Sequence, residues 1–162
     1  MIAREIEPST AVELATRLWR EPGFVWLDGD GSAQGARSYL AIRPSAHVVS
    51  APGDPAPLAR LRALEEETST TFGEVPRFIG FLGYGAAWPA VAGASNVPSY
   101  AFGRYDAVIA VDHVRGTTTL VGEPPAVAAL EAALAQTATT PTARCGAVTA
   151  EPADVHAAAI RE

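Results

Sequence analysis

Apolar residues recur at helical spacing in three segments of the chain. In 9–20 this pattern follows Thr10 and Glu13, which have the spacing of a capping box, so a helix is expected to begin there. Two further segments predict helices over 57–67 and 124–136, the last opening with two prolines, which a first helical turn tolerates. The apolar face of the first helix is predicted to consist of Val12, Ala15, Leu18 and Trp19.

Short apolar runs bounded by glycine, proline and charged residues predict strands. The run 24–27 is apolar throughout, which predicts a strand buried on both faces. A glycine-rich loop and the runs 38–42 and 46–50 follow it, a succession typical of a meander of neighbouring strands. Glycines inside the run 76–85 indicate either β-bulges or a close approach of two backbones. Further strands are expected over 76–85, 100–113 and 117–121, the last two paired as a hairpin.

The order of these elements predicts an α+β fold, in which a mainly antiparallel sheet has the three helices packed on it. We expect residues 1–136 to form one domain and residues 137–151 to be a linker. Residues 152–162 begin an amphipathic helix that the end of the sequence interrupts, so they are expected to belong to a further domain.

Composition narrows the class of protein further. The 162 residues suit one compact domain, and the single cysteine, Cys145, excludes an internal disulfide and favours a reducing compartment. All 12 basic residues are arginines and the net charge is −6, which argues against a nucleic-acid surface. No apolar run reaches the ~18 residues of a membrane span, and the N-terminus lacks the apolar core of a signal peptide. We therefore expect a cytoplasmic protein.

No catalytic or metal-binding residue is predicted from the pattern of polar side chains. The glycines of 29–35 lack the spacing of a dinucleotide fingerprint, and a strand follows them, so a hairpin loop is expected. Asp106 and Asp112 bracket an apolar run and are interpreted as the two solvated ends of a strand. His113 with one aspartate falls short of a zinc site, and nothing in the sequence ties another histidine to it.

Three segments, in order, resemble one enzyme family. The segments 25–29 and 38–44 resemble the opening "LLDS…RYSYLGADP" pattern of chorismate-using synthases, 76–84 looks like their "PPFxGGxxGYLGYD" segment, and 98–113 is similar to their "PDxxFGxYDWVLAFDH" strand. The resemblance covers roughly residues 20–122 and points to the N-terminal domain of component I of anthranilate synthase and aminodeoxychorismate synthase. It is closer to aminodeoxychorismate synthase.

This resemblance implies the function of a longer parent enzyme. That enzyme would aminate chorismate for the folate and 4-aminobenzoate pathway, with ammonia from a glutamine amidotransferase subunit and Mg²⁺ holding the substrate's carboxylate. The family's catalytic and metal-binding residues lie in a C-terminal chorismate-binding domain, so the resemblance implies that this chain is structural or regulatory and inactive alone. It further implies the N-terminal part of a two-sheet fold, with residues 152–162 beginning the chorismate-binding domain.

Many members of the family hold an amino acid, usually tryptophan, in the N-terminal domain. The marker is an acidic residue followed by serine, and here the pair is Asp28-Gly29. Asp28 would pair with a ligand ammonium or with Arg37, or it would only satisfy loop N–H groups. Two other functions stay open: an anthranilate synthase component I with tryptophan feedback, and a free-standing binding domain without chemistry. The candidate pocket residues are Leu27, Asp28 and Gly29, facing Arg37, Ser38 and Tyr39.

Overall fold

The computed structural model describes most of the first 136 residues. The described parts are 1–32, 35–51, 56, 59, 62–63, 71–83 and 98–136. The linker expected over 137–151 and the helix expected over 152–162 lie outside the described residues, as does most of the helix expected over 57–67.

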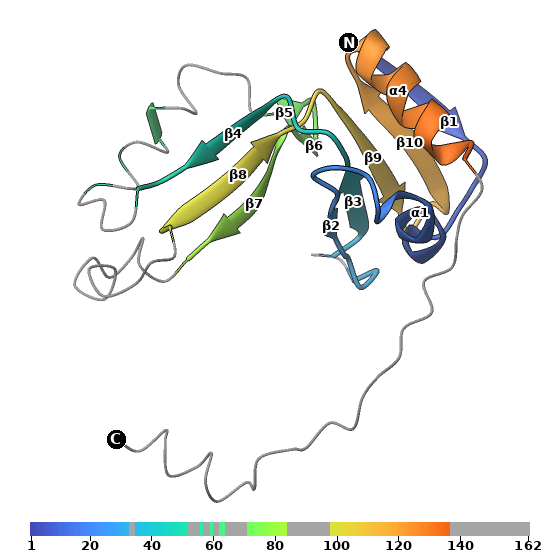
Figure 1. Ribbon diagram of the computed structural model, residues 1–162. Coiled ribbons are helices and arrows are strands. Elements are labelled where there is room, and N and C mark those ends of the chain that lie inside the picture. The colour runs from blue at the N-terminus through green and yellow to red at the C-terminus, as the bar shows by residue number, and fades with distance from the viewer. Residues whose placement is uncertain are drawn as a thin grey trace, which may run out of the picture.

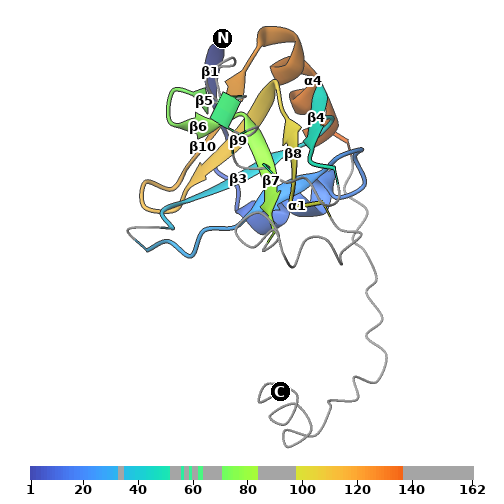
Figure 2. The ribbon, with the colours of Figure 1, turned by 90° about the vertical axis from the view of Figure 1, so that its left-hand side faces the viewer.

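A five-stranded antiparallel sheet with two helices on one face forms the larger part of the described structure (Figure 1). The strand order is β1-β10-β9-β3-β2. The helices lie on the side of this sheet away from the second, smaller sheet, as Figures 1 and 2 both show. The elements are β1 (Ile2–Ile6), α1 (Ala11–Leu18), β2 (Val25–Leu27), β3 (Arg37–Ala41), β9 (Ala107–Asp112), β10 (Thr117–Gly122) and α4 (Pro124–Leu134).

The first core lies between this sheet and the two helices. Leucine and isoleucine side chains from both layers fill it, and α1 begins with the predicted capping box between Thr10 and Glu13. The predicted apolar face of α1 is wrong in part, because Val12 is 62% exposed and Trp19 is 40% exposed. The predicted face and the observed face both have helical spacing, and the packing of α1 against β3 and α4 determines which of the two is buried. The buried residues of α1 are Ala11, Leu14, Ala15 and Leu18.

A three-stranded antiparallel sheet, ordered β4-β8-β7, continues from the first sheet. The predicted meander is therefore wrong, because the strand after β3 pairs with β8 and leaves the first sheet. The chain turns away at Arg43, whose φ of 52° is left-handed, and Ser45 then donates its amide hydrogen to the carbonyl oxygen of Arg104. The elements are β4 (Ala46–Val49), β7 (Phe78–Leu82) and β8 (Tyr100–Arg104), with a small hairpin of β5 (Thr71–Phe72) and β6 (Val75–Pro76) beside them.

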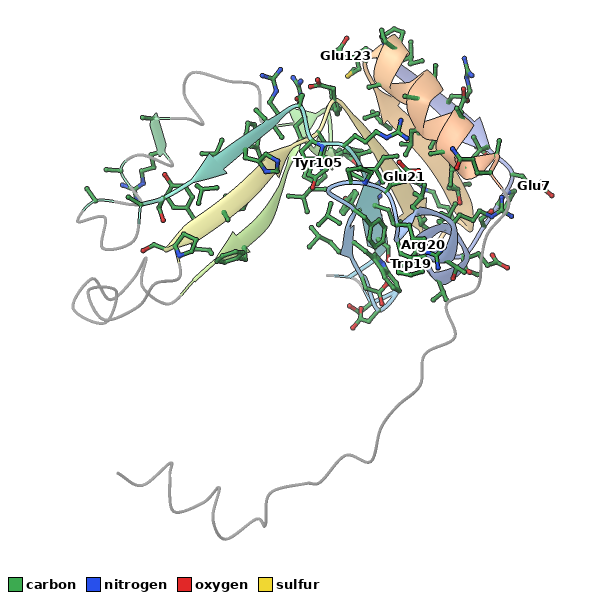
Figure 3. All side chains as sticks on the ribbon, in the orientation of Figure 1. Glu7, Trp19, Arg20, Glu21, Tyr105 and Glu123 are labelled. Atoms are coloured by element: carbon green, nitrogen blue, oxygen red, sulfur yellow. The ribbon has the colours of Figure 1, made fainter. Side chains whose placement is uncertain are left out.

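The long strand predicted over 100–113 is divided between the two sheets. β8 ends at Arg104, and the chain enters β9 two residues later, after Tyr105 and Asp106. The Tyr105 ring packs on Gly103, and its hydroxyl donates a hydrogen bond of 2.9 Å to the carbonyl oxygen of Gly23 (Figure 3). This side chain joins the end of the smaller sheet to the loop that precedes β2.

A second core covers part of the other face of the five-stranded sheet. There Phe72, Val75, Ile79 and Tyr105 pack on alternate residues of the strands, including Val108 and Val121. β2 is an edge strand whose Leu27 is 42% exposed, so the expectation of a strand buried on both faces is wrong. The predicted hairpin of β9 and β10 and the helix from Pro124 are confirmed, as is the α+β class with antiparallel strands and helices.

Candidate functional site

The β2–β3 hairpin carries every candidate pocket residue, but it divides them between two faces. Leu27 pairs directly with Tyr39, so these two side chains share a face, and Arg37 lies on that face too because it is two residues away. Ser38, between them, points to the opposite face, where the helices pack. The predicted approach of the two strand ends is found, but the six residues do not line one pocket.

On the helix-facing side, Ser38 is the centre of a polar cluster. Its side chain is fully buried, and its Oγ donates to Oδ1 of Asp28 at 2.9 Å. The same oxygen accepts from the backbone N–H of Gly29 at 2.9 Å and lies 2.7 Å from Nε2 of His113. Asp28 and His113 themselves are exposed at the surface. The cluster therefore connects two exposed titratable side chains through one buried hydroxyl.

The contacts of Ser38 differ in what they say about hydrogen positions. Ser38 donates its hydroxyl hydrogen to Asp28, whereas the donor and acceptor in its 2.7 Å contact with His113 depend on the imidazole tautomer. The order of contacts differs from that of a Ser-His-Asp triad, because the Asp28 carboxylate accepts from Ser38, whereas in a triad it accepts from the histidine. We call this cluster of Asp28, Gly29, Ser38 and His113 the Ser38 clamp.

Gly29 is required by the same geometry. A Cβ at this position would overlap the carbonyl oxygens of Arg37 and Gly35. Its N–H is held by the Ser38 hydroxyl, so the backbone is fixed against β3. Position 29 therefore has no room for a side chain, and the hydroxyl that binds in this corner comes from Ser38.

One hypothesis from the sequence is that Arg37 pairs with Asp28. The structure contradicts it, because Arg37 pairs with two other carboxylates. Its NH1 donates to Oε2 of Glu74 at 2.7 Å, and its Nε donates to Oδ2 of Asp112 at 3.3 Å. The hydrogen bond with Glu74, followed by those with Tyr39 and Asp112, raises the pKa of the Arg37 guanidinium. The alternative for Asp28, an Asx turn, is found at Asp30 instead, where Ser32 holds the pKa of the carboxyl low.

Sequence reasoning missed two members of this region. The sequence ties His113 to no partner, but the register of β3 against β9 places Ser38 opposite Val111 and so brings residue 113 within reach. Glu74 lies in the turn between β5 and β6, and no pattern in the sequence connects that turn to Arg37. For His113, the alternation of side chains along β3 was a signal available in the sequence. For Glu74 the sequence contains no such signal.

Within the described part of the chain, no three His, Cys, Asp or Glu side chains gather as metal ligands would. Neither of the helices described is long and apolar enough to cross a membrane.

Comparisons with known proteins give no independent identification. The chain matches no family model, and no curated protein matches it significantly. The family resemblance of the three sequence segments therefore stays a prediction, and the function is argued from the placement of these segments and from the surfaces that they form.

Proposed function

We propose that this chain is the N-terminal, non-catalytic domain of a chorismate-aminating enzyme similar to component I of aminodeoxychorismate synthase. The observation that carries the proposal is the placement of the three resembling segments. The first forms β2 and β3, the second forms β7, and the third forms β8 and β9. β3 pairs with β9, β8 pairs with β7, and β2 contacts β7, so segments far apart in the sequence meet around one junction.

Exposed apolar side chains support a structural role next to a further domain. Val49 and Phe81 lie on the same face of the smaller sheet as the buried Ile79, and they are 55% and 45% exposed. Leu27 is exposed on the face of the larger sheet that Ile79 covers in part. Large apolar side chains on adjoining faces are typical of a surface that another protein part covers. We assign that surface to the chorismate-binding domain of the same enzyme.

The proposed division of labour leaves the chemistry to other parts. Ammonia would come from a glutamine amidotransferase subunit, and the chorismate-binding domain would hold Mg²⁺ and chorismate. This chain would supply the sheets against which that domain packs. The Ser38 hydroxyl and the N–H of Gly29 bind each other, so neither is free for an amino acid in this arrangement, which argues against tryptophan feedback.

Two measurements test the proposal. The 162-residue chain alone, incubated with chorismate, Mg²⁺ and ammonium, should leave chorismate unchanged. The product of the full reading frame, including sequence after codon 162, should convert chorismate to aminodeoxychorismate, identified by mass. Formation of anthranilate, recognised by its fluorescence, would assign the anthranilate branch instead. Turnover by the 162-residue chain, or a reading frame and gene neighbourhood without a chorismate-binding domain, would overturn the proposal.

A further inference from the structure

A second site lies on the opposite face of β3 from the Ser38 clamp. It is a pocket of about 380 Å³ near the turn that joins β9 and β10. Its volume lies in the range of small-molecule sites. The pocket combines two guanidinium groups with one carboxylate, one tyrosine ring and two apolar side chains. Its lining residues are Ala36, Arg37, Tyr39, Asp112, Val114 and Arg115.

The two carboxylates that bind Arg37 are not equivalent. Asp112 belongs to the fold, because its Oδ1 accepts the backbone N–H groups of Val114 and Arg115 at 3.1 and 2.8 Å, and its side chain is only 14% exposed. Glu74 comes from a different hairpin, its side chain is 80% exposed, and its only hydrogen-bond partner among the described residues is the Arg37 guanidinium at 2.7 Å. Glu74 thus accepts a hydrogen bond from NH1 of Arg37, but no other hydrogen bond among the described residues fixes the Glu74 side chain in place.

We propose that this pocket binds a small organic carboxylate, which replaces Glu74 on the Arg37 guanidinium. The carboxylate would meet the donor atoms of Arg37 that Glu74 now occupies, and a guanidinium binds carboxylates through paired N–H groups. The Tyr39 ring with Ala36 and Val114 provides an apolar wall for the body of such a molecule. This inference does not depend on the proposed function.

The charges around the pocket favour this exchange. Arg37 and Arg115 balance Glu74 and Asp112, so removing Glu74 from the site leaves one uncompensated positive charge. The charge of Arg115 acts on both carboxyl groups, since it contributes to the lowered pKa of Glu74 and of Asp112 after their hydrogen-bond partners. An ion pair with one partner this exposed is weak, so a ligand displaces Glu74 at little cost.

The test titrates benzoate into the ¹⁵N-labelled 162-residue chain at neutral pH and low salt. Amide signals of Ala36, Arg37 and Arg115 should shift in a saturable manner. Glu74→Gln should tighten binding by roughly two- to five-fold, because it removes the competing carboxylate. The matched control is Glu131→Gln, which makes the same charge change at another exposed arginine pair, Arg4 with Glu131 at 2.7 Å. That control should leave the affinity unchanged.

Four results would overturn the proposal. The first is that benzoate causes no saturable shift in the unchanged chain or in Glu74→Gln, and the second is that both glutamine variants gain affinity equally. The third is that inorganic phosphate binds as tightly as benzoate, and the fourth is that Arg37→Gln binds benzoate as well as the unchanged chain does. The first result would show that there is no binding site, and the second would show that the gain in affinity comes from the change in net charge alone. The third removes the assignment to an organic carboxylate. The Glu74→Gln arm stands even if Arg37→Gln fails to fold, because Glu74 is exposed and makes no other hydrogen bond in the described residues.

Discussion

The two sheets differ in how completely each buries its own apolar side chains. The larger sheet and its helices enclose Leu18, Leu40, Ile109, Leu120 and Leu130 with 0–1% exposure. In the smaller sheet Ile79, and Tyr100 at the outer end, are buried, but Val49, Phe81 and Leu82 at that outer end are between 45% and 55% exposed. Among the described residues, the larger sheet therefore has an enclosed core, whereas three large apolar side chains of the smaller sheet are exposed at its outer end.

This difference shows what stabilises each region. The larger sheet gains its stability from apolar burial, which contributes about 25 cal/mol per Å² removed from water. Backbone pairing with β8 and contacts at the base dominate in the smaller sheet, whose strands β4 and β7 each pair on one side only within the described residues. A partner that covered these exposed side chains would add apolar burial to the smaller sheet, and the proposed function gives that role to a chorismate-binding domain.

The largest expected effect contrasts the same substitution in the two sheets. Leu120→Ala, in a fully buried position, should lower the free energy of unfolding by about 3 kcal/mol or more, because it leaves a cavity. Leu82→Ala, at a position 55% exposed, should lower it by less than about 1 kcal/mol. Urea unfolding of both variants measures the difference. Equal losses would show that the smaller sheet has a closed core of its own.

The parts of the fold that could be predicted from sequence are those with local signals. The Thr10–Glu13 capping box, the turn at Gly116 and the prolines at the start of α4 each lie within a few residues of the structure they determine. The hairpin of β9 and β10 followed from the same kind of signal. Such elements need no knowledge of distant contacts.

The division into two sheets could not be predicted in this way. An apolar run does not specify which strand it pairs with, so the sequence predicts that β4 neighbours β3, although its residues pair with residues of β8 that lie 52 to 58 positions further along the chain. The change of sheet depends on the left-handed backbone of Arg43, and the break between β8 and β9 depends on the packing of Tyr105. Both are tertiary features.

The candidate site shows the same limit. The hairpin correctly indicated that Asp28 lies near Ser38, because residues that flank a short loop face each other. It did not indicate His113 or Glu74, which come from other strands and turns. Strand alternation was available in the sequence, and applying it to 37–39 would have separated Arg37 and Tyr39 from Ser38.

The second prediction sharpens the comparison by disrupting only the smaller sheet. In Gly80→Ala the new Cβ would overlap the backbone of Ala101 on β8, so the strands must separate, at a cost of about 1 to 3 kcal/mol. Hydrogen exchange should increase at amides of β7 and β8 and stay slow in β9 and β10. Gly83→Ala is the control, because its Cβ would lie 3.4 Å from the nearest atom, the Ser99 carbonyl oxygen. Equal protection in both variants would contradict the close approach.

The third prediction concerns the connection between the sheets. Tyr105→Phe removes the hydroxyl that donates to Gly23 and should lower the free energy of unfolding by about 1 kcal/mol. The ring and its packing on Gly103 remain, so the loss measures the hydrogen bond and not the core. Faster exchange should appear at amides near Gly23 and at the start of β2. An unchanged unfolding midpoint in urea would show that the hydroxyl does not hold the two regions together.

The smallest expected effect concerns whether protonation of Asp112, at the end of β9, destabilises the larger sheet at low pH. Hydrogen bonds from the amides of Arg115 and Val114, with that from Arg37, lower the pKa of Asp112 below its ordinary value of 3.8. Ionised Asp112 therefore stabilises the fold above pH 3.8, and this contribution is lost as the pH falls through the folded-state pKa. Asp112→Asn keeps an acceptor oxygen for the turn but removes the titration, so the difference in urea midpoint between pH 7 and pH 3 should be smaller than in the unchanged chain. Glu5→Gln, an exposed position on β1 of the same sheet, is the control for net charge. If Glu5→Gln reduces the pH dependence of the urea midpoint equally, the effect comes from overall charge. The ion pair of Arg37 with Asp112 is then not the cause of the loss of stability in acid.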